Sequence, residues 1–126
     1  MTTDQTQIIA ELKPILKKYS PPYEPKKDGE GGCDLYYFGE VEAFGRKYDE
    51  MFFAAIQKMK NYVGFYYMPI YANPELAKKL HPDLLKLLKG KSCFHIKKLD
   101  ENLKKHIAEA LKTGHECYKK MGWCKG

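Results

Sequence analysis

Apolar residues in the first part of the chain follow a helical period. Between residues 5 and 19 they recur at steps of three and four, which predicts an amphipathic helix with one face on a core. These positions are Ile8, Ile9, Leu12, Ile15, Leu16 and Tyr19. Pro14 removes one backbone donor, so we expect a kink or a short break there. Residues 20–32 hold three prolines and three glycines without an apolar period, which predicts a loop.

Three consecutive segments then have the character of β-strands. They are rich in aromatic and β-branched residues, and short polar breaks separate them, which predicts an antiparallel meander. The segments span 33–44, 48–59 and 61–71. The middle segment has apolar residues at both odd and even positions, which is typical of a strand covered on both faces.

The rest of the chain predicts helices around one more strand. Pro82 divides residues 73–90 into two short helices, and residues 91–98 form a short strand. Asp100 is a good N-cap for a long last helix with an apolar face. The predicted order is therefore α-β-β-β-α-β-α. It indicates an α+β fold, with an antiparallel sheet of about four strands and helices packed on it.

Composition and charge narrow the functional classes. The chain has 126 residues, which suits one domain spanning 1–126, and its net charge is +6. That charge permits anionic partners, but Arg46 is the only arginine, which argues against sequence-specific nucleic-acid binding. We find neither a signal peptide nor a membrane span, so we expect no membrane partner, a cytoplasmic location and four free cysteine thiols.

Carboxylates cluster modestly near the turn between the first two predicted strands. Glu40 and Glu42 are two residues apart and share a strand face. Asp49 and Glu50 begin the next strand. Hard cations bind where several such oxygens converge, so these four residues are the candidate metal site. The alternative is a solvated edge of the sheet with lysine and arginine as counter-charges.

Aromatic residues gather in the segment 61–71. Adjacent strand residues point to opposite faces, so Tyr66 and Tyr67 must lie on different sides of the sheet. One set of rings then packs in the core, and the other is free to bind a small molecule, a protein partner or, less favourably, stacked bases. The candidate groove residues are Tyr37, Tyr66, Tyr67 and His95.

Catalytic signatures are absent from the sequence. There is no phosphate loop, dinucleotide fingerprint or HExxH motif. Cys93 and His95 share a strand face, and they could meet His115 or Cys117 if the last helix covers that face. No oxyanion hole accompanies them, so we predict a protein that is not an enzyme.

Four segments carry a resemblance to a known family. They are "LKPILKKYSP", "MFFAAIQKMKNYVGFYYMPIY", "PELAKKLHPDLLKLLKGKSCFHIKKLDE" and "ALKTGHECYKKMGW". In these segments the chain resembles the YdhG-like family of small bacterial proteins, catalogued as domain of unknown function 1801. The resemblance implies a YdhG-like α+β domain, distantly frataxin-like. It also implies an iron-chaperone role, as one branch of the family is regarded as having, with iron as the cargo.

The sequence therefore supports two functional hypotheses. The first is a small cytoplasmic binding or chaperone-type protein of non-enzymatic role, handling iron as the resemblance implies. The alternative is a module that binds a small molecule or a protein partner in an aromatic groove on the sheet face.

Overall fold

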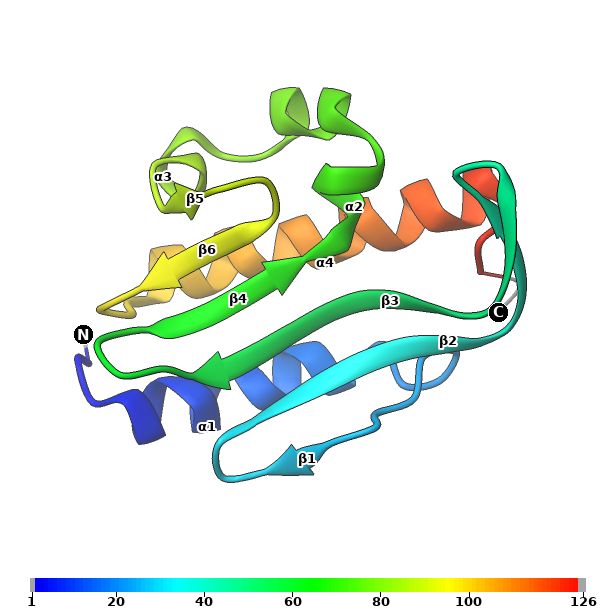
Figure 1. The fold of residues 1–126 in the computed structure, drawn as a ribbon. Coiled ribbons are helices and arrows are strands. Elements are labelled where there is room, and N and C mark those ends of the chain that lie inside the picture. Colours follow the sequence, from blue (N-terminus) through cyan, green and yellow to red (C-terminus); the bar gives the residue numbers. More distant parts are fainter. Residues whose placement is uncertain (1, 125–126) are drawn as a thin grey trace.

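The structure, a computed structural model, describes residues 2–124 and consists of one antiparallel sheet with helices on one face (Figure 1). The strands are β1 (Asp28–Gly29), β2 (Gly32–Ala43), β3 (Arg46–Lys58), β4 (Val63–Tyr67), β5 (Leu88–Lys89) and β6 (Cys93–Ile96). The helices are α1 (Gln5–Lys17), α2 (Met68–Ala72), the 3-10 helix η1 (Pro74–Lys79), α3 (Pro82–Leu85) and α4 (Glu101–Met121). The strands lie in the order β1-β2-β3-β4-β6-β5.

The two long helices begin at the residues that their sequences indicate. The side chain of Asp4 accepts a hydrogen bond from the Gln7 N–H at 3.1 Å, and that of Asp100 accepts one from the Leu103 N–H at 2.8 Å. Both bonds satisfy N–H groups that the first helical turn leaves without partners. Helix α1 runs through Pro14 without the break that the sequence suggested. Helix α4 ends at Gly122, whose φ of 76° suits glycine.

The fold class is confirmed, but the strand count is corrected from about four to six. Strands β1 and β5 have two residues each, which is too short for a sequence pattern to reveal. The third predicted strand ends at Tyr67, and Met68–Ala72 form helix α2 instead. Pro69 explains this change, because it has no N–H for a strand ladder and fits the first turn of a helix.

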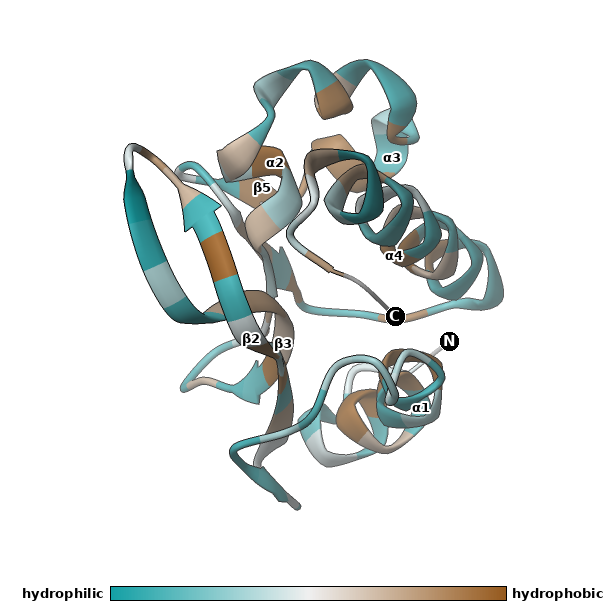
Figure 2. Cartoon of the chain, turned by 90° about the vertical axis from the view of Figure 1, so that its right-hand side faces the viewer, coloured by the Kyte–Doolittle hydropathy of each residue, from teal (hydrophilic) through white to brown (hydrophobic). Residues whose placement is uncertain are grey.

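Both long helices pack on the same face of the sheet (Figures 1 and 2). Buried aromatic rings fill the space between them, and the ring of Tyr23 stacks on Phe53 with centroids 4.1 Å apart. The hydroxyl of Tyr118 donates to the Phe52 carbonyl at 2.6 Å, and that of Tyr67 donates to the Ala110 carbonyl at 2.5 Å. These bonds satisfy the only polar atoms of deeply buried rings.

A bulge in β3 decides which rings face away from the helices. Leu35 lies opposite Ala54, but Tyr36 lies opposite Phe52, so Phe53 has no partner in the register. An extra residue shifts the alternation of side chains by one position. Phe53 is therefore fully buried on the helix side, while Phe52 stays half-buried on the open side.

None of the helices in the described part of the chain combines the length and the apolar character needed to cross a membrane.

Candidate functional site

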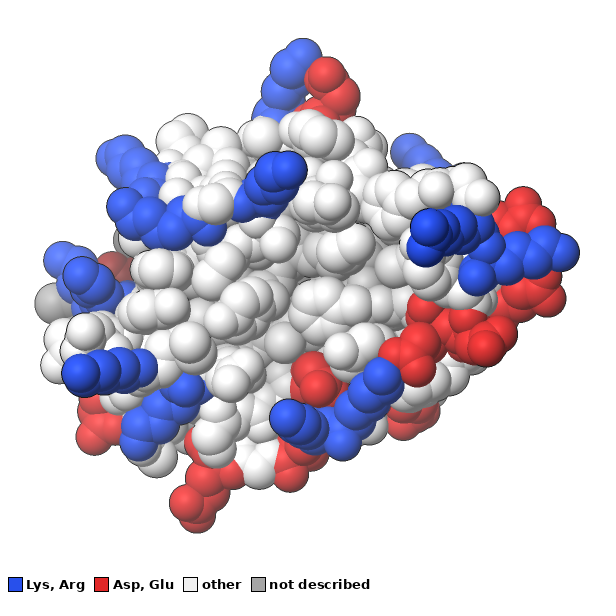
Figure 3. All heavy atoms as spheres, in the orientation of Figure 1, with Lys and Arg blue, Asp and Glu red and all other residues white. Residues whose placement is uncertain are grey.

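The face of the sheet opposite α1 and α4 has an uncharged centre. In Figure 3, lysine, arginine and acidic side chains gather at the margin of this face, and its middle is free of them. Aromatic contacts organise it: the Tyr36 and Phe52 rings lie 5.2 Å apart, and the Tyr62 and His95 rings stack at 3.7 Å. We call this surface the open face.

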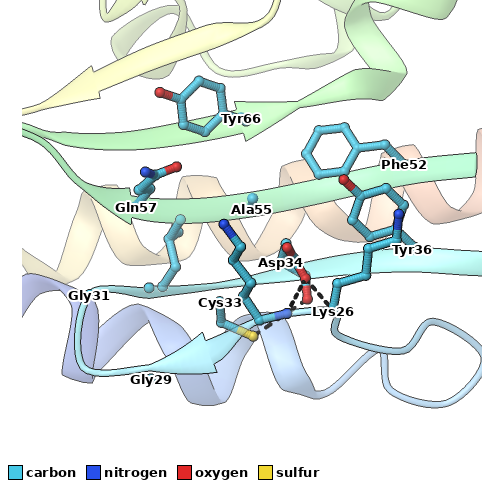
Figure 4. Close-up of a pocket in the computed structure, with 13 residues that line it drawn as sticks. Lys26, Gly29, Gly31, Cys33, Asp34, Tyr36, Phe52, Ala55, Gln57 and Tyr66 are labelled. Carbon is cyan, nitrogen blue, oxygen red and sulfur yellow. Dashed lines mark hydrogen bonds between the residues drawn. The ribbon is translucent and has the colours of Figure 1, made fainter.

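A groove of about 560 Å³ crosses the open face. Its floor consists of side chains from three neighbouring strands, namely Tyr36 on β2, Phe52 and Ala55 on β3, and Tyr66 on β4 (Figure 4). Alternation of side chains places all four on one side of the sheet once the bulge is included. The arrangement can hold a flat molecule with one of its faces against aromatic rings.

The ring of Tyr66 is held in place by its neighbours. It lies over Gly64, where an added Cβ would come within 2.9 Å of the ring. Its hydroxyl points at the sulfur of Met59, 3.8 Å away, which is a weak acceptor. Partial burial raises the pKa of Tyr66, so the hydroxyl keeps its proton and remains a donor at neutral pH. Tyr66 is thus a fixed part of the groove floor, and its hydroxyl can donate a hydrogen bond to a ligand.

The loop that precedes β2 forms one wall of the groove. One carboxylate oxygen of Asp34 accepts hydrogen bonds from the backbone N–H groups of Lys26 and Lys27, at 2.7 and 3.0 Å. On the far side of the loop, Asp28 forms ion pairs with Lys13 and Lys17 of α1. The hydrogen bond from Lys13 is the main reason that the pKa of Asp28 lies below its ordinary value. The loop is therefore attached both to β2 and to α1.

A charged group stands at the mouth of the groove. The ammonium of Lys26 lies 4.2 Å from the centroid of the Tyr36 ring and also pairs with Glu50. The hydrogen bond to Glu50 raises the pKa of Lys26, so this lysine stays charged. The exposed amide of Gln57 lies along the same groove and offers both a donor and an acceptor.

Of the four predicted groove residues, the structure brings only Tyr66 into this groove. Tyr67 is fully buried on the helix side, as the alternation required. The ring of Tyr37 lies beside Gly39 and packs against the core. His95 lines a different cavity, at the end of the sheet that carries β5 and β6. Sequence reasoning missed Tyr36 and Phe52, because their orientation depends on the strand register and on the bulge.

The predicted metal residues remain spread along two strands. Glu40 lies 3.5 Å from Lys47, and Glu50 pairs with Lys26. Glu42 is the register partner of Lys47, and Asp49 is exposed. Among residues 2–124, the group of three metal-ligating side chains that converges contains none of these four. Their role in holding iron stays a prediction.

The four cysteines are free thiols in the structure. Cys93 and His95 lie on β6 opposite Tyr66 and Gly64, so their side chains share the open face with Tyr66, while α4 packs on the opposite face. The last helix therefore does not bring His115 or Cys117 to them. Burial raises the pKa of the Cys93 and Cys33 thiols, which makes both weak nucleophiles at neutral pH.

Comparisons with known proteins identify no relative of this chain. No family model matches the chain, and neither a curated protein nor a solved structure is significantly similar to it. The resemblance to the YdhG-like family therefore stays a prediction.

Proposed function

We propose that the chain is a non-enzymatic binding module whose open-face groove holds a small, planar and largely apolar molecule. The observation that carries this proposal is the floor of Tyr36, Phe52 and Tyr66 beneath a groove of about 560 Å³. Ligand sites in proteins have volumes of about 300–1,000 Å³ and are lined mostly by apolar and aromatic side chains. Exposed rings that line a concave surface gain free energy when a flat ligand displaces water from them.

Polar groups at the edge of the groove indicate which polar atoms the ligand needs. The Tyr66 hydroxyl has only a thioether as its partner, and the Gln57 amide is exposed. Both can donate to acceptors at the rim of a ring system. The charge of Lys26 is already balanced by Glu50, so a strong anion is not required. The expected ligand class is therefore a planar ring system with hydrogen-bond acceptors on its edge.

A fragment screen followed by two-dimensional NMR tests the proposal. Planar heteroaromatic fragments should shift the amide signals of the groove strands, and saturated analogues of equal size should shift them far less. Phe52→Ala and Tyr66→Ala should weaken binding by at least about tenfold each. Tyr71→Ala, which truncates an exposed ring outside the groove, is the matched control and should leave affinity unchanged.

Two results would oppose the groove as the site. One is equal binding of planar and saturated fragments. The other is a loss of affinity in Tyr71→Ala as large as that in Tyr66→Ala, which would place the binding elsewhere.

Iron handling is the alternative that the family resemblance implies. Calorimetric titration with ferrous and ferric iron under reducing conditions tests it. Binding that disappears when Glu40, Glu42, Asp49 and Glu50 are replaced by their amides would favour that function over the groove. An absence of heat above that of a non-binding protein would eliminate it.

A further inference from the structure

Three metal-ligating side chains converge where α3 packs against α4. His81 and Asp83 lie at the start of α3, and His106 lies on α4. One ligand atom from each residue lies within 4.8 Å of the other two. The rings of His81 and His106 are stacked, with centroids 3.7 Å apart and planes inclined by 14°.

Local structure explains why His81 and Asp83 face each other. His81 is the N-cap of α3, and its Nδ1 accepts the backbone N–H of Asp83 at 3.0 Å. Pro82 between them fits the first helical position and fixes the turn. As a result, Nδ1 of His81 lies 3.8 Å from a carboxylate oxygen of Asp83. Helix α4 then supplies His106 from a segment that the core holds in place.

A second observation concerns one of these three residues. Nδ1 of His106 is the buried side-chain nitrogen that has no hydrogen-bond partner in the described structure. Buried polar atoms are normally paired, and an exception calls for an explanation such as an ion. Stacking on His81 positions the His106 ring but cannot satisfy that nitrogen.

We propose that His81, Asp83 and His106 bind a divalent transition-metal ion. Two imidazoles and one carboxylate form a ligand set that suits Zn²⁺ and Fe²⁺ and leaves coordination positions open. Bonds of about 2.0–2.2 Å to the metal place ligand atoms roughly 3–3.5 Å apart, so ligand atoms that lie within 4.8 Å of one another must approach by up to about 1.5 Å. One of the two stacked imidazole rings must also turn out of the stack, because the lone pairs lie in the ring planes. His81 would exchange its bond to the Asp83 N–H for a bond to the metal.

Asp83 and His106 also line a cavity of about 680 Å³ that opens to solvent. This cavity provides the entry path that a metal site needs. Lys86 lies 3.5 Å from the Asp83 carboxylate and competes with a cation for it. More lysines, Lys89, Lys97 and Lys98, line the same cavity. Their charge lowers metal affinity and favours an anion as the additional ligand of the bound ion.

Titration of the reduced chain with Co²⁺, followed by visible absorption, tests the proposal. Nitrogen and oxygen ligation should give d–d bands without the near-ultraviolet charge-transfer band of a cobalt–thiolate bond. His106→Gln and Asp83→Asn should each weaken binding by at least about tenfold, since even indirect partners of a metal change affinity by 10–100-fold. His95→Gln removes a histidine from the wall of the same cavity and should bind Co²⁺ like the unaltered chain.

Thermal unfolding with Zn²⁺ supplies a second measurement that does not depend on absorption. Zn²⁺ should raise the midpoint of the unaltered chain and of His95→Gln, and should not raise that of His106→Gln, because only a folded site gains from the ion. A thiolate band, equal loss in His95→Gln, or undiminished binding in both His106→Gln and Asp83→Asn would overturn the proposal. Phe52→Ala should bind the metal normally. The metal-site proposal can therefore be disproved without disproving the groove proposal, and the reverse also holds.

Discussion

The hydroxyl of Tyr23 lies 2.8 Å from Nδ1 of His115, across 92 residues of sequence. Tyr23 belongs to the loop between α1 and β1, and His115 belongs to α4. The Tyr23 ring also stacks on Phe53, so the loop is joined to the sheet and to the last helix through one residue. Burial holds the pKa of His115 below its ordinary value, and Nδ1 of the neutral ring can accept a hydrogen bond from the Tyr23 hydroxyl.

Stability should therefore fall in mild acid because of His115. In the unfolded chain, His115 binds a proton near pH 6.5, and in the folded chain it binds that proton only at a lower pH. The stability that neutral His115 contributes is fully present above its pKa in the unfolded chain, and it is lost as the pH falls through its pKa in the folded chain. Urea denaturation between pH 8 and pH 5 should show this loss, and His115→Gln should reduce the slope. An unchanged slope in the variant would assign the loss to other groups.

The adjacent residues Tyr66 and Tyr67 should differ sharply when replaced by alanine. Tyr67 is fully buried and bonded to α4, so Tyr67→Ala should cost about 3–5 kcal/mol of unfolding free energy. Tyr66 is half-buried on the open face, so Tyr66→Ala should cost at least about 1.5 kcal/mol less while weakening groove ligands. Urea denaturation measures both. Equal losses of unfolding free energy in the two variants would mean that Tyr66 on the open face is buried as deeply as Tyr67 in the core.

The extent to which the sequence predicts this fold depends on the length of each pattern. The long apolar period of α4 and the N-cap at Asp100 are both confirmed. The apolar run after Tyr67 predicts a continuing strand, because a short apolar segment does not distinguish strand from helix. Pro69 is the signal in the sequence that the strand ends before it.

Gly114 should not tolerate alanine, although alanine favours helices. An added Cβ would come within 2.7 Å of the Tyr67 hydroxyl and of the Pro69 ring. Overpacking costs about 1–3 kcal/mol, and the gain in helix propensity of about 1 kcal/mol offsets only part of it. Thermal or urea unfolding of Gly114→Ala measures the net loss.

A double substitution tests whether the crowding at Gly114 is the cause. Tyr67→Phe removes the hydroxyl, one of the three atoms within 3.0 Å of the added Cβ, so the loss from Gly114→Ala should be smaller in that background. Strict additivity of the two substitutions would show that the loss has another origin. Gly122→Ala is a contrasting control, because its loss would come from a φ of 76° and not from crowding.

Alkylation should label the four thiols in two stages. Cys93 is half-buried, and the other three are buried, so Cys93 should react first in the native chain. Its raised pKa makes the reaction slow at neutral pH and faster as the pH rises. Mass spectrometry after unfolding without reductant should count four labelled cysteines. A pair that requires reductant would contradict the free thiols seen here.

The candidate site is less predictable from sequence than the fold, because the faces taken by Phe52 and Phe53 depend on a bulge. The apolar run in β3 suggested a strand covered on both faces. Instead, the bulge at Phe53 turns that ring into the core and presents Phe52 to the groove. A shift of one residue inverts the face of every later side chain, and hydrophobicity alone does not record it.

The two shortest strands have a consequence for association between molecules. Strands β1 and β5 close the two edges of the sheet, and each offers only two residues for further pairing. Long exposed edges of a sheet template aggregation. Strand β1 pairs with Gly32 and Cys33 at the start of the twelve-residue strand β2, and the bridge between Glu24 and Tyr36 occupies a further position on that edge. The Asp28 ion pairs to Lys13 and Lys17 thus do more than shape a groove wall. They hold in place the short strand that covers the start of β2 and so shortens the edge left open for pairing.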